Sequence, residues 1–126
     1  MAVESAVRAH NAENLNKFLP LAEETSAKIN HRLYQAIALR GRGVSHGLAG
    51  EKAEAANSLA AALDEFRALD TPWQVGRTLV ELGKIEQSRG NVDIAKAHYS
   101  QALAAFESLG AVPDAERTSA ALESLN

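Results

Sequence analysis

The sequence predicts an all-α fold built from repeated helix pairs, and two observations lead to this prediction. Apolar residues make up 46 % of the 126 residues and aromatic residues only 5 %, so the apolar content is mainly Ala and Leu, which favours closely packed helices over sheets. The second observation is an internal repeat with a period of forty residues, which is typical of stacked helical units.

The repeat is visible when the sequence is shifted against itself by forty positions. Gly43 then aligns with Gly83, and Gly50 aligns with Gly90. Several apolar positions on either side of these glycines also align, and the similarity continues to the end of the chain. The further aligned pairs are Leu39 with Leu79, Ala55 with Ala95, Ala62 with Ala102, Leu63 with Leu103, Phe66 with Phe106, Leu69 with Leu109, and RTLVEL at 77–82 with RTSAAL at 117–122.

Each full repeat is predicted to contain two helices, because apolar residues recur at helical spacing on one face of each segment. In the second repeat these helices cover 72–89 and 92–109. The offset of forty residues places the preceding pair at 31–48 and 51–69, and a single closing helix at 112–125. We therefore expect one domain of about six to seven helices over 1–126, with a partial leading repeat at 1–30, repeats at 31–70 and 71–110, and a closing helix in 111–126.

The predicted helix ends carry residues that favour turns and N-caps. Thr71 and Gln74 have the spacing of a capping box, in which side chains satisfy two backbone N–H groups. Gly90 is expected to adopt the left-handed conformation that ends a helix, and Asn91 to act as the N-cap of the next. Gly83 lies inside a helix, where Gly costs about 1 kcal/mol relative to Ala, so another helix is expected to approach closely there.

Charge and composition argue against several classes of partner. The net charge is −3, from 16 acidic residues against 13 Lys and Arg, without a basic block, so no electrostatic nucleic-acid interface is expected. No run approaches the roughly 18 apolar residues that a membrane span needs. The chain has no cysteine, which is compatible with a reducing compartment. We therefore expect a cytoplasmic protein that binds neither nucleic acid nor membrane.

No pattern of catalytic, metal-binding or cofactor-binding residues is found, so we expect no enzyme. The glycine-rich segment at 41–43 lacks the Lys-Ser/Thr ending of a phosphate loop and follows a helical pattern. Serines occur in neither GxSxG nor SxxK, and no nucleophile lies beside a base. Trp73, the single tryptophan, is expected to pack across the junction between repeats rather than to bind a ligand. The four histidines that show no metal-ligand spacing are His10, His31, His46 and His98.

Seven residues of the second repeat stand at a spacing that resembles the tetratricopeptide repeat: Leu79, Leu82, Gly83, Gly90, Ala95, Tyr99 and Ala102. The resemblance covers about 31–126. It implies a right-handed superhelix of antiparallel helix pairs in which Gly83 faces the partner helix near Tyr99. The sequence departs from the family in its period of forty rather than 34 residues, and in Glu86 and His46, which stand where the family has an aromatic residue. The long period is similar to the C-terminal repeats of bacterial signalling ATPases and LuxR-family regulators.

The resemblance implies a noncatalytic module that binds a partner peptide or helix in a concave groove, with a regulatory or scaffolding role. Arg77 and Arg117 are repeat equivalents, so they are expected to form a basic stripe suited to carboxylates of an acidic partner. The competing interpretation is that these arginines pair with Glu81, Glu116 or other neighbours on a solvated face. By the resemblance, the groove residues are Ile37, Arg40, Val44, Arg77, Val80, Lys84 and Arg117.

Two alternative functions stay open at this point. The chain starts in the middle of a repeat, so its first helices are expected to expose Leu15, Phe18 and Leu19, and two copies could bury these residues in a symmetric homodimer. A small-ligand sensor or enzyme with a pocket between helices is the less favoured alternative, because the expected interface positions are almost all Ala, Leu, Gly and Phe.

Overall fold

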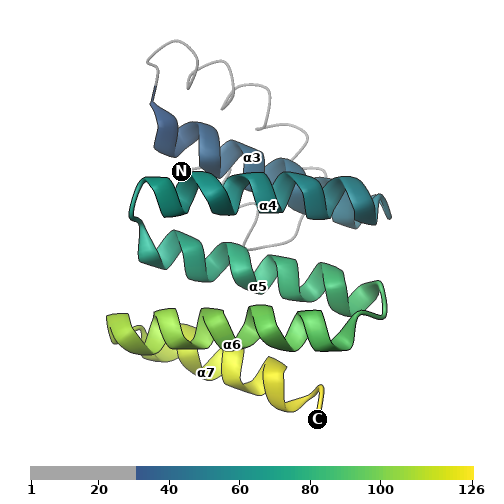
Figure 1. The fold of residues 1–126 in the computed structure, drawn as a ribbon, viewed down its shortest axis with the longest axis vertical. Coiled ribbons are helices and arrows are strands. Elements are labelled where there is room, and N and C mark those ends of the chain that lie inside the picture. The colour runs from purple at the N-terminus through teal and green to yellow at the C-terminus, as the bar shows by residue number, and fades with distance from the viewer. Residues whose placement is uncertain (1–30) are drawn as a thin grey trace. The chain divides into compact units, whose positions relative to one another are not determined.

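The computed structural model describes residues 31–126, so the leading repeat expected at 1–30 and its apolar side chains lie outside the described residues. The described part is all-helical and contains no strand (Figure 1). The predicted helix positions are confirmed to within two residues at each end. The helices are α3 (Arg32–Leu48), α4 (Lys52–Ala68), α5 (Pro72–Ser88), α6 (Val92–Leu109) and α7 (Val112–Glu123).

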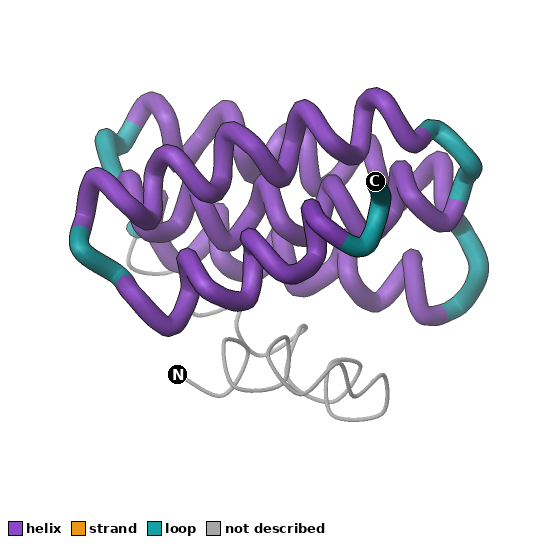
Figure 2. The backbone as a smooth tube through the Cα atoms, turned by 90° about the horizontal axis from the view of Figure 1, so that it is seen from below, coloured by secondary structure: helices purple, strands orange, loops and turns teal. Residues whose placement is uncertain are grey.

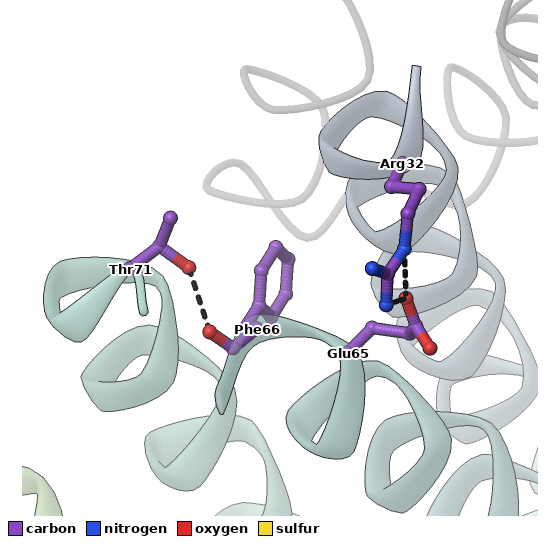
Figure 3. A network of polar contacts seen from close by, with 4 residues as sticks. All are labelled: Arg32, Glu65, Phe66 and Thr71. Atoms are coloured by element: carbon purple, nitrogen blue, oxygen red, sulfur yellow. Dashed lines mark hydrogen bonds and ion pairs between the residues drawn. The ribbon is translucent and has the colours of Figure 1, made fainter. Parts of the chain in front are cut away.

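The chain divides into two compact units between Glu65 and Phe66, in the last turn of α4. In the first unit, α3 and α4 approach closely at Gly43, where a Cβ atom would lie 2.7 Å from Cγ of Leu59 and 3.3 Å from the carbonyl oxygen of Ala55. At the surface, the Arg32 guanidinium donates to Oε2 of Glu65 at 2.8 Å (Figure 3). Both side chains are about half exposed, so this ion pair contributes less than about 1 kcal/mol.

In the second unit, α6 packs against both α5 and α7. Two glycines of α5 admit aromatic rings of α6. A Cβ at Gly76 would lie 2.7 Å from Cε1 of Phe106, and a Cβ at Gly83 would lie 2.7 Å from Cε1 of Tyr99. The expectation that Gly83 faces its partner helix near Tyr99 is therefore confirmed. The buried apolar residues of this interface are Leu79, Leu82, Ala95, Tyr99, Ala102 and Phe106.

The backbone hydrogen bonds that end the helices also repeat after forty residues. After α3 the N–H of Glu51 donates to the carbonyl of His46 at 2.8 Å, and after α5 the N–H of Asn91 donates to that of Glu86 at 2.9 Å. This bond belongs to a Schellman turn, which ends a helix with one left-handed residue. The connections are correspondingly short, as Figure 2 shows. The left-handed residues of the four turns between helices are Gly50, Asp70, Gly90 and Gly110, with φ of 82°, 53°, 83° and 69°.

The predicted side-chain N-caps are wrong, although the helices begin where expected. The Thr71 hydroxyl donates to the carbonyl oxygen of Phe66 at 3.1 Å (Figure 3), and the Asn91 amide donates to Oε2 of Glu86 at 2.9 Å. Neither side chain caps the helix that follows. The short turns explain this difference, because the backbone N–H of Thr71 also bonds to the Phe66 carbonyl. Both polar groups of Thr71 therefore close the preceding helix.

Candidate interaction surface

The three groove residues predicted on α3 lie in the interior of the structure. The exposed fractions of Ile37, Arg40 and Val44 are 4 %, 0 % and 5 %. Their side chains therefore offer almost no surface to a partner, and this face of α3 is a packing face. The sequence pattern could not reveal this, because an arginine at a helix position is ordinarily solvated.

Two of the predicted positions, Arg77 on α5 and Arg117 on α7, are linked through Trp73 and Asp114. Trp73 Nε1–H donates to Oδ2 of Asp114 at 3.1 Å, which confirms that Trp73 packs across the junction to the next repeat. The Arg77 guanidinium carbon lies 5.5 Å from the Trp73 ring centroid, in cation–π geometry. Arg117 donates to Oδ1 of Asp114 at 2.6 Å. Both repeat-equivalent arginines thus contact the same Trp–Asp pair.

The two arginines differ in how much of them a partner could reach. Arg77 is 9 % exposed, whereas the Arg117 side chain is 66 % exposed and its partner Asp114 only 15 %. The pairing of Arg117 with a neighbouring acid agrees with the competing interpretation, with Asp114 in place of the expected Glu116. Of the two arginines that were expected to form a basic stripe, only Arg117 is therefore well exposed.

About two turns further along α5, a second cation, Lys84, pairs with a buried acid. Lys84 Nζ lies 3.5 Å from Oε1 of Glu81, and the side chains are 47 % and 7 % exposed, respectively. Val80, which lies between Arg77 and Lys84 in the sequence, is partly exposed. We call the residues of these two helices the α5–α7 surface: Trp73, Arg77, Val80, Lys84, Asp114 and Arg117. On this surface the carboxylates lie deeper than the exposed ammonium of Lys84 and guanidinium of Arg117, so the outermost charge is positive.

Sequence reasoning missed Asp114, although a weak signal was present. Asp114 precedes Arg117 by three residues, a spacing at which opposite charges meet on a helix, and it follows Trp73 by 41 residues, which is one repeat plus one position. The Pro at the second position of α7 fixes where this first helical turn begins.

A separate polar cluster closes the turn between α5 and α6. The Glu86 carboxylate is nearly buried, with 9 % of its side chain exposed, and it accepts hydrogen bonds from Arg89 and from Asn91, each at 2.9 Å. In the preceding repeat, His46 Nδ1 and Oε1 of Glu51 lie 3.2 Å apart at the equivalent turn. Glu86 and His46 therefore both contact polar residues of the turn that follows their helix, which is a structural role.

Two ionisable groups near this turn are perturbed by burial. Burial lowers the pKa of His98 from 6.5, while the charge of Glu86 acts in the opposite direction and that of Arg67 adds to the lowering. Nδ1 of His98 is buried without a hydrogen-bond partner. Burial raises the pKa of Tyr99, and the nearby Glu81 raises it further. These groups lie in the packing interface and not on the α5–α7 surface.

Residues 31–126 contain neither a cluster of metal-binding side chains nor a membrane-spanning helix. In this range no three His, Asp or Glu side chains are grouped as metal ligands would be. Of the five helices described, none combines the length and the apolar character that are needed to cross a bilayer.

Comparison with known proteins identifies no relative of this chain. The chain matches no protein-family model, no curated protein and no solved structure. The functional interpretation therefore depends on the geometry of the α5–α7 surface and on the repeat itself.

Proposed function

We propose that the chain is a noncatalytic protein-interaction module of the tetratricopeptide type, in which the α5–α7 surface binds an acidic segment of a partner protein. The observation that carries the proposal is the depth at which charged side chains lie on α5 and α7. Lys84 and Arg117 are exposed, while Glu81 and Asp114 lie beneath them. The proposal includes the right-handed superhelix, a cytoplasmic location and a regulatory or scaffolding role that follow from the family resemblance.

The repeat supports the tetratricopeptide part of the proposal. The same turn bonds recur forty residues apart, and the same close contact recurs at Gly43 with Leu59 and at Gly83 with Tyr99. A helix pair that repeats its interface in this way buries its apolar faces against its neighbours, and it leaves its other side chains to vary with the partner.

The surface has the mixed chemistry that protein interfaces use. An exposed ion pair contributes at most about 1 kcal/mol, so two cations alone hold a partner weakly. Trp73 and Val80 add apolar contact area beside them, and aromatic residues and arginine are enriched among residues that dominate binding energy. Asp114 orients both the Trp73 indole and the Arg117 guanidinium, which reduces the entropy lost on binding.

The proposal is tested by selection from a random peptide library displayed on phage. We expect the wild-type chain to enrich peptides that contain several Asp or Glu residues. The double variant Lys84→Glu and Arg117→Glu should lose this enrichment. The matched control is Arg67→Glu with Lys96→Glu, which makes the same change in net charge on α4 and α6, and it should retain the enrichment.

Arg77 is unsuitable for this test because it is buried, so that a carboxylate at its position would destabilise the fold itself. Binding of the selected peptides should weaken as salt is added, since the interaction is between exposed charges. Selected peptides that lack acidic residues, or that bind the Lys84/Arg117 double variant as tightly as wild type, would show that this surface is not the binding site. The self-association alternative rests on residues 1–30 and stays a prediction.

A further inference from the structure

Both carboxylate oxygens of Asp114 are engaged inside the protein. Oδ2 accepts a hydrogen bond from Trp73 Nε1 at 3.1 Å, and Oδ1 accepts one from Arg117 Nη2 at 2.6 Å. The Asp114 side chain is only 15 % exposed. Because Trp73 belongs to α5 and Arg117 to α7, the carboxylate is fixed from two helices at once. It therefore restricts the positions that the Arg117 side chain can adopt.

The contact with Asp114 leaves one edge of the Arg117 guanidinium open. The hydrogen bond is made by Nη2, which carries one hydrogen beside Nη1 and another beside Nε. Whichever of these hydrogens is given to Asp114, the other one forms a pair of parallel donors with its neighbouring nitrogen. The Arg117 side chain is 66 % exposed, so a carboxylate of a partner can reach this pair.

Lys84, the other exposed cation of the α5–α7 surface, offers charge without this direction. Its ammonium lies 3.5 Å from Oε1 of Glu81. An ammonium is a compact charge without a plane that matches the two oxygens of a carboxylate, whereas a guanidinium has such a plane. Lys84 therefore attracts an acidic partner, and Arg117 can also select where one carboxylate of that partner lies.

We infer that Asp114 is a positioning residue, which holds Arg117 so that the guanidinium binds one carboxylate of the partner through two parallel hydrogen bonds. The inference rests on the proposed function, and it adds a requirement for geometry to the requirement for charge. Asp114 then has two opposite effects. Its negative charge repels an acidic partner, but its hydrogen bonds reduce the rotamer freedom that Arg117 loses on binding. The second effect is the larger at physiological salt, where exposed charges are screened.

The experiment measures binding of hexaglutamate to the isotope-labelled chain by NMR, with dissociation constants taken from the backbone amide shifts. In Asp114→Asn, the asparagine presents an oxygen to one of the two donors and an N–H2 group to the other. This variant should bind hexaglutamate about three- to tenfold more weakly than wild type. The matched control is Glu116→Gln, which makes the same change in net charge at an exposed position of α7. It should bind at least as tightly as wild type.

Two further measurements separate positioning from a general loss of structure. Trp73→Phe keeps the net charge and an aromatic ring but removes the indole N–H. It should weaken binding, and without any ligand it should lower the heteronuclear NOE of the Arg117 Nε–H group. In an Arg117→Ala background, Asp114→Asn should no longer weaken binding, whereas a loss of structure would weaken binding in both backgrounds. Urea midpoints of all variants check that they fold.

The outcomes distinguish the inference from the proposed function. If Asp114→Asn binds as tightly as Glu116→Gln, or if its effect persists without Arg117, the inference is wrong and the proposed function is unaffected. If wild type does not bind hexaglutamate, or if Lys84→Glu with Arg117→Glu binds it equally well, the proposed function is wrong and the inference is wrong with it.

Discussion

Replacing Gly83 with alanine tests the central packing contact of the second unit. Alanine is ordinarily the better helix former by about 1 kcal/mol, so on an exposed helix this change would stabilise the chain. Gly83 instead faces the Tyr99 ring, and a Cβ atom there would lie 2.7, 2.8 and 2.9 Å from three of its atoms. The structure therefore predicts that the sign of the effect is reversed.

The magnitude follows from how little the ring can move. The added Cβ is about 0.7 Å short of ordinary van der Waals contact. Tyr99 is 1 % exposed, and its hydroxyl donates to Oε1 of Gln87 at 3.2 Å, so the ring is fixed at both ends. Overpacking of this kind costs about 1–3 kcal/mol. After the gain in helix propensity of about 1 kcal/mol, we expect Gly83→Ala to lower the free energy of unfolding by up to about 2 kcal/mol.

The assay is urea denaturation followed by far-ultraviolet circular dichroism, with the change read from the midpoint at constant slope. A double-mutant cycle with Tyr99→Ala isolates the contact. Removal of the ring costs about 3–5 kcal/mol by itself, but in that background the alanine at 83 has room and should stabilise by about 1 kcal/mol. The coupling between the two sites is then about 1–3 kcal/mol. A stabilising Gly83→Ala in the wild-type background, or additive effects, would refute the close contact.

Three further predictions concern the turns and the buried histidine. Gly110→Ala places a Cβ in open space at φ 69°. The left-handed conformation alone should therefore lower the free energy of unfolding by about 1 kcal/mol. An unchanged urea midpoint would contradict this account of the turn. Glu86→Ala removes the acceptor of Arg89 and Asn91. It should lower the free energy of unfolding by only about 1–2 kcal/mol, because both donors are exposed and return to water. Unaltered hydrogen exchange at the Asn91 side-chain amide would argue against these hydrogen bonds. Because burial lowers the pKa of His98 in the folded state, its contribution to stability is complete above about pH 6.5 and is lost as the pH falls through the folded-state pKa. The wild-type chain should therefore lose more stability than His98→Gln between about pH 7.5 and 5, and equal losses would exclude the effect.

The helices and their close contact could be predicted because local signals for them repeat. Apolar spacing and the offset of forty residues located all five described helices. The glycine at position 83 indicated the close approach of another helix, and the resemblance to the tetratricopeptide repeat pointed to Tyr99. Side-chain caps could not be predicted in the same way. Thr71 and Asn91 have the right chemistry for an N-cap, but each also lies in the Schellman turn of the preceding helix, and that earlier helix receives their hydrogen bonds.

The candidate site was only partly predictable, for a related reason. Repeat equivalence placed Arg77 and Arg117 in corresponding positions, yet their surroundings differ. Arg77 lies over the Trp73 ring and is buried, whereas Arg117 reaches the surface beside Asp114. A pattern of residue types specifies which face of a helix a side chain occupies, but exposure also depends on which neighbours cover that face.

The sequence by itself determined the helical class, the period of forty residues, the helix positions and the glycine at the α5–α6 contact, because these depend on propensity and spacing along one chain. Only the tertiary structure decided that Ile37, Arg40 and Val44 are buried, that Asp114 joins Trp73 to Arg117, and that Arg77 is far less exposed than Arg117. These properties depend on which helices pack together and on how deep each side chain lies. Distances between residues far apart in sequence arise only when the helices are assembled.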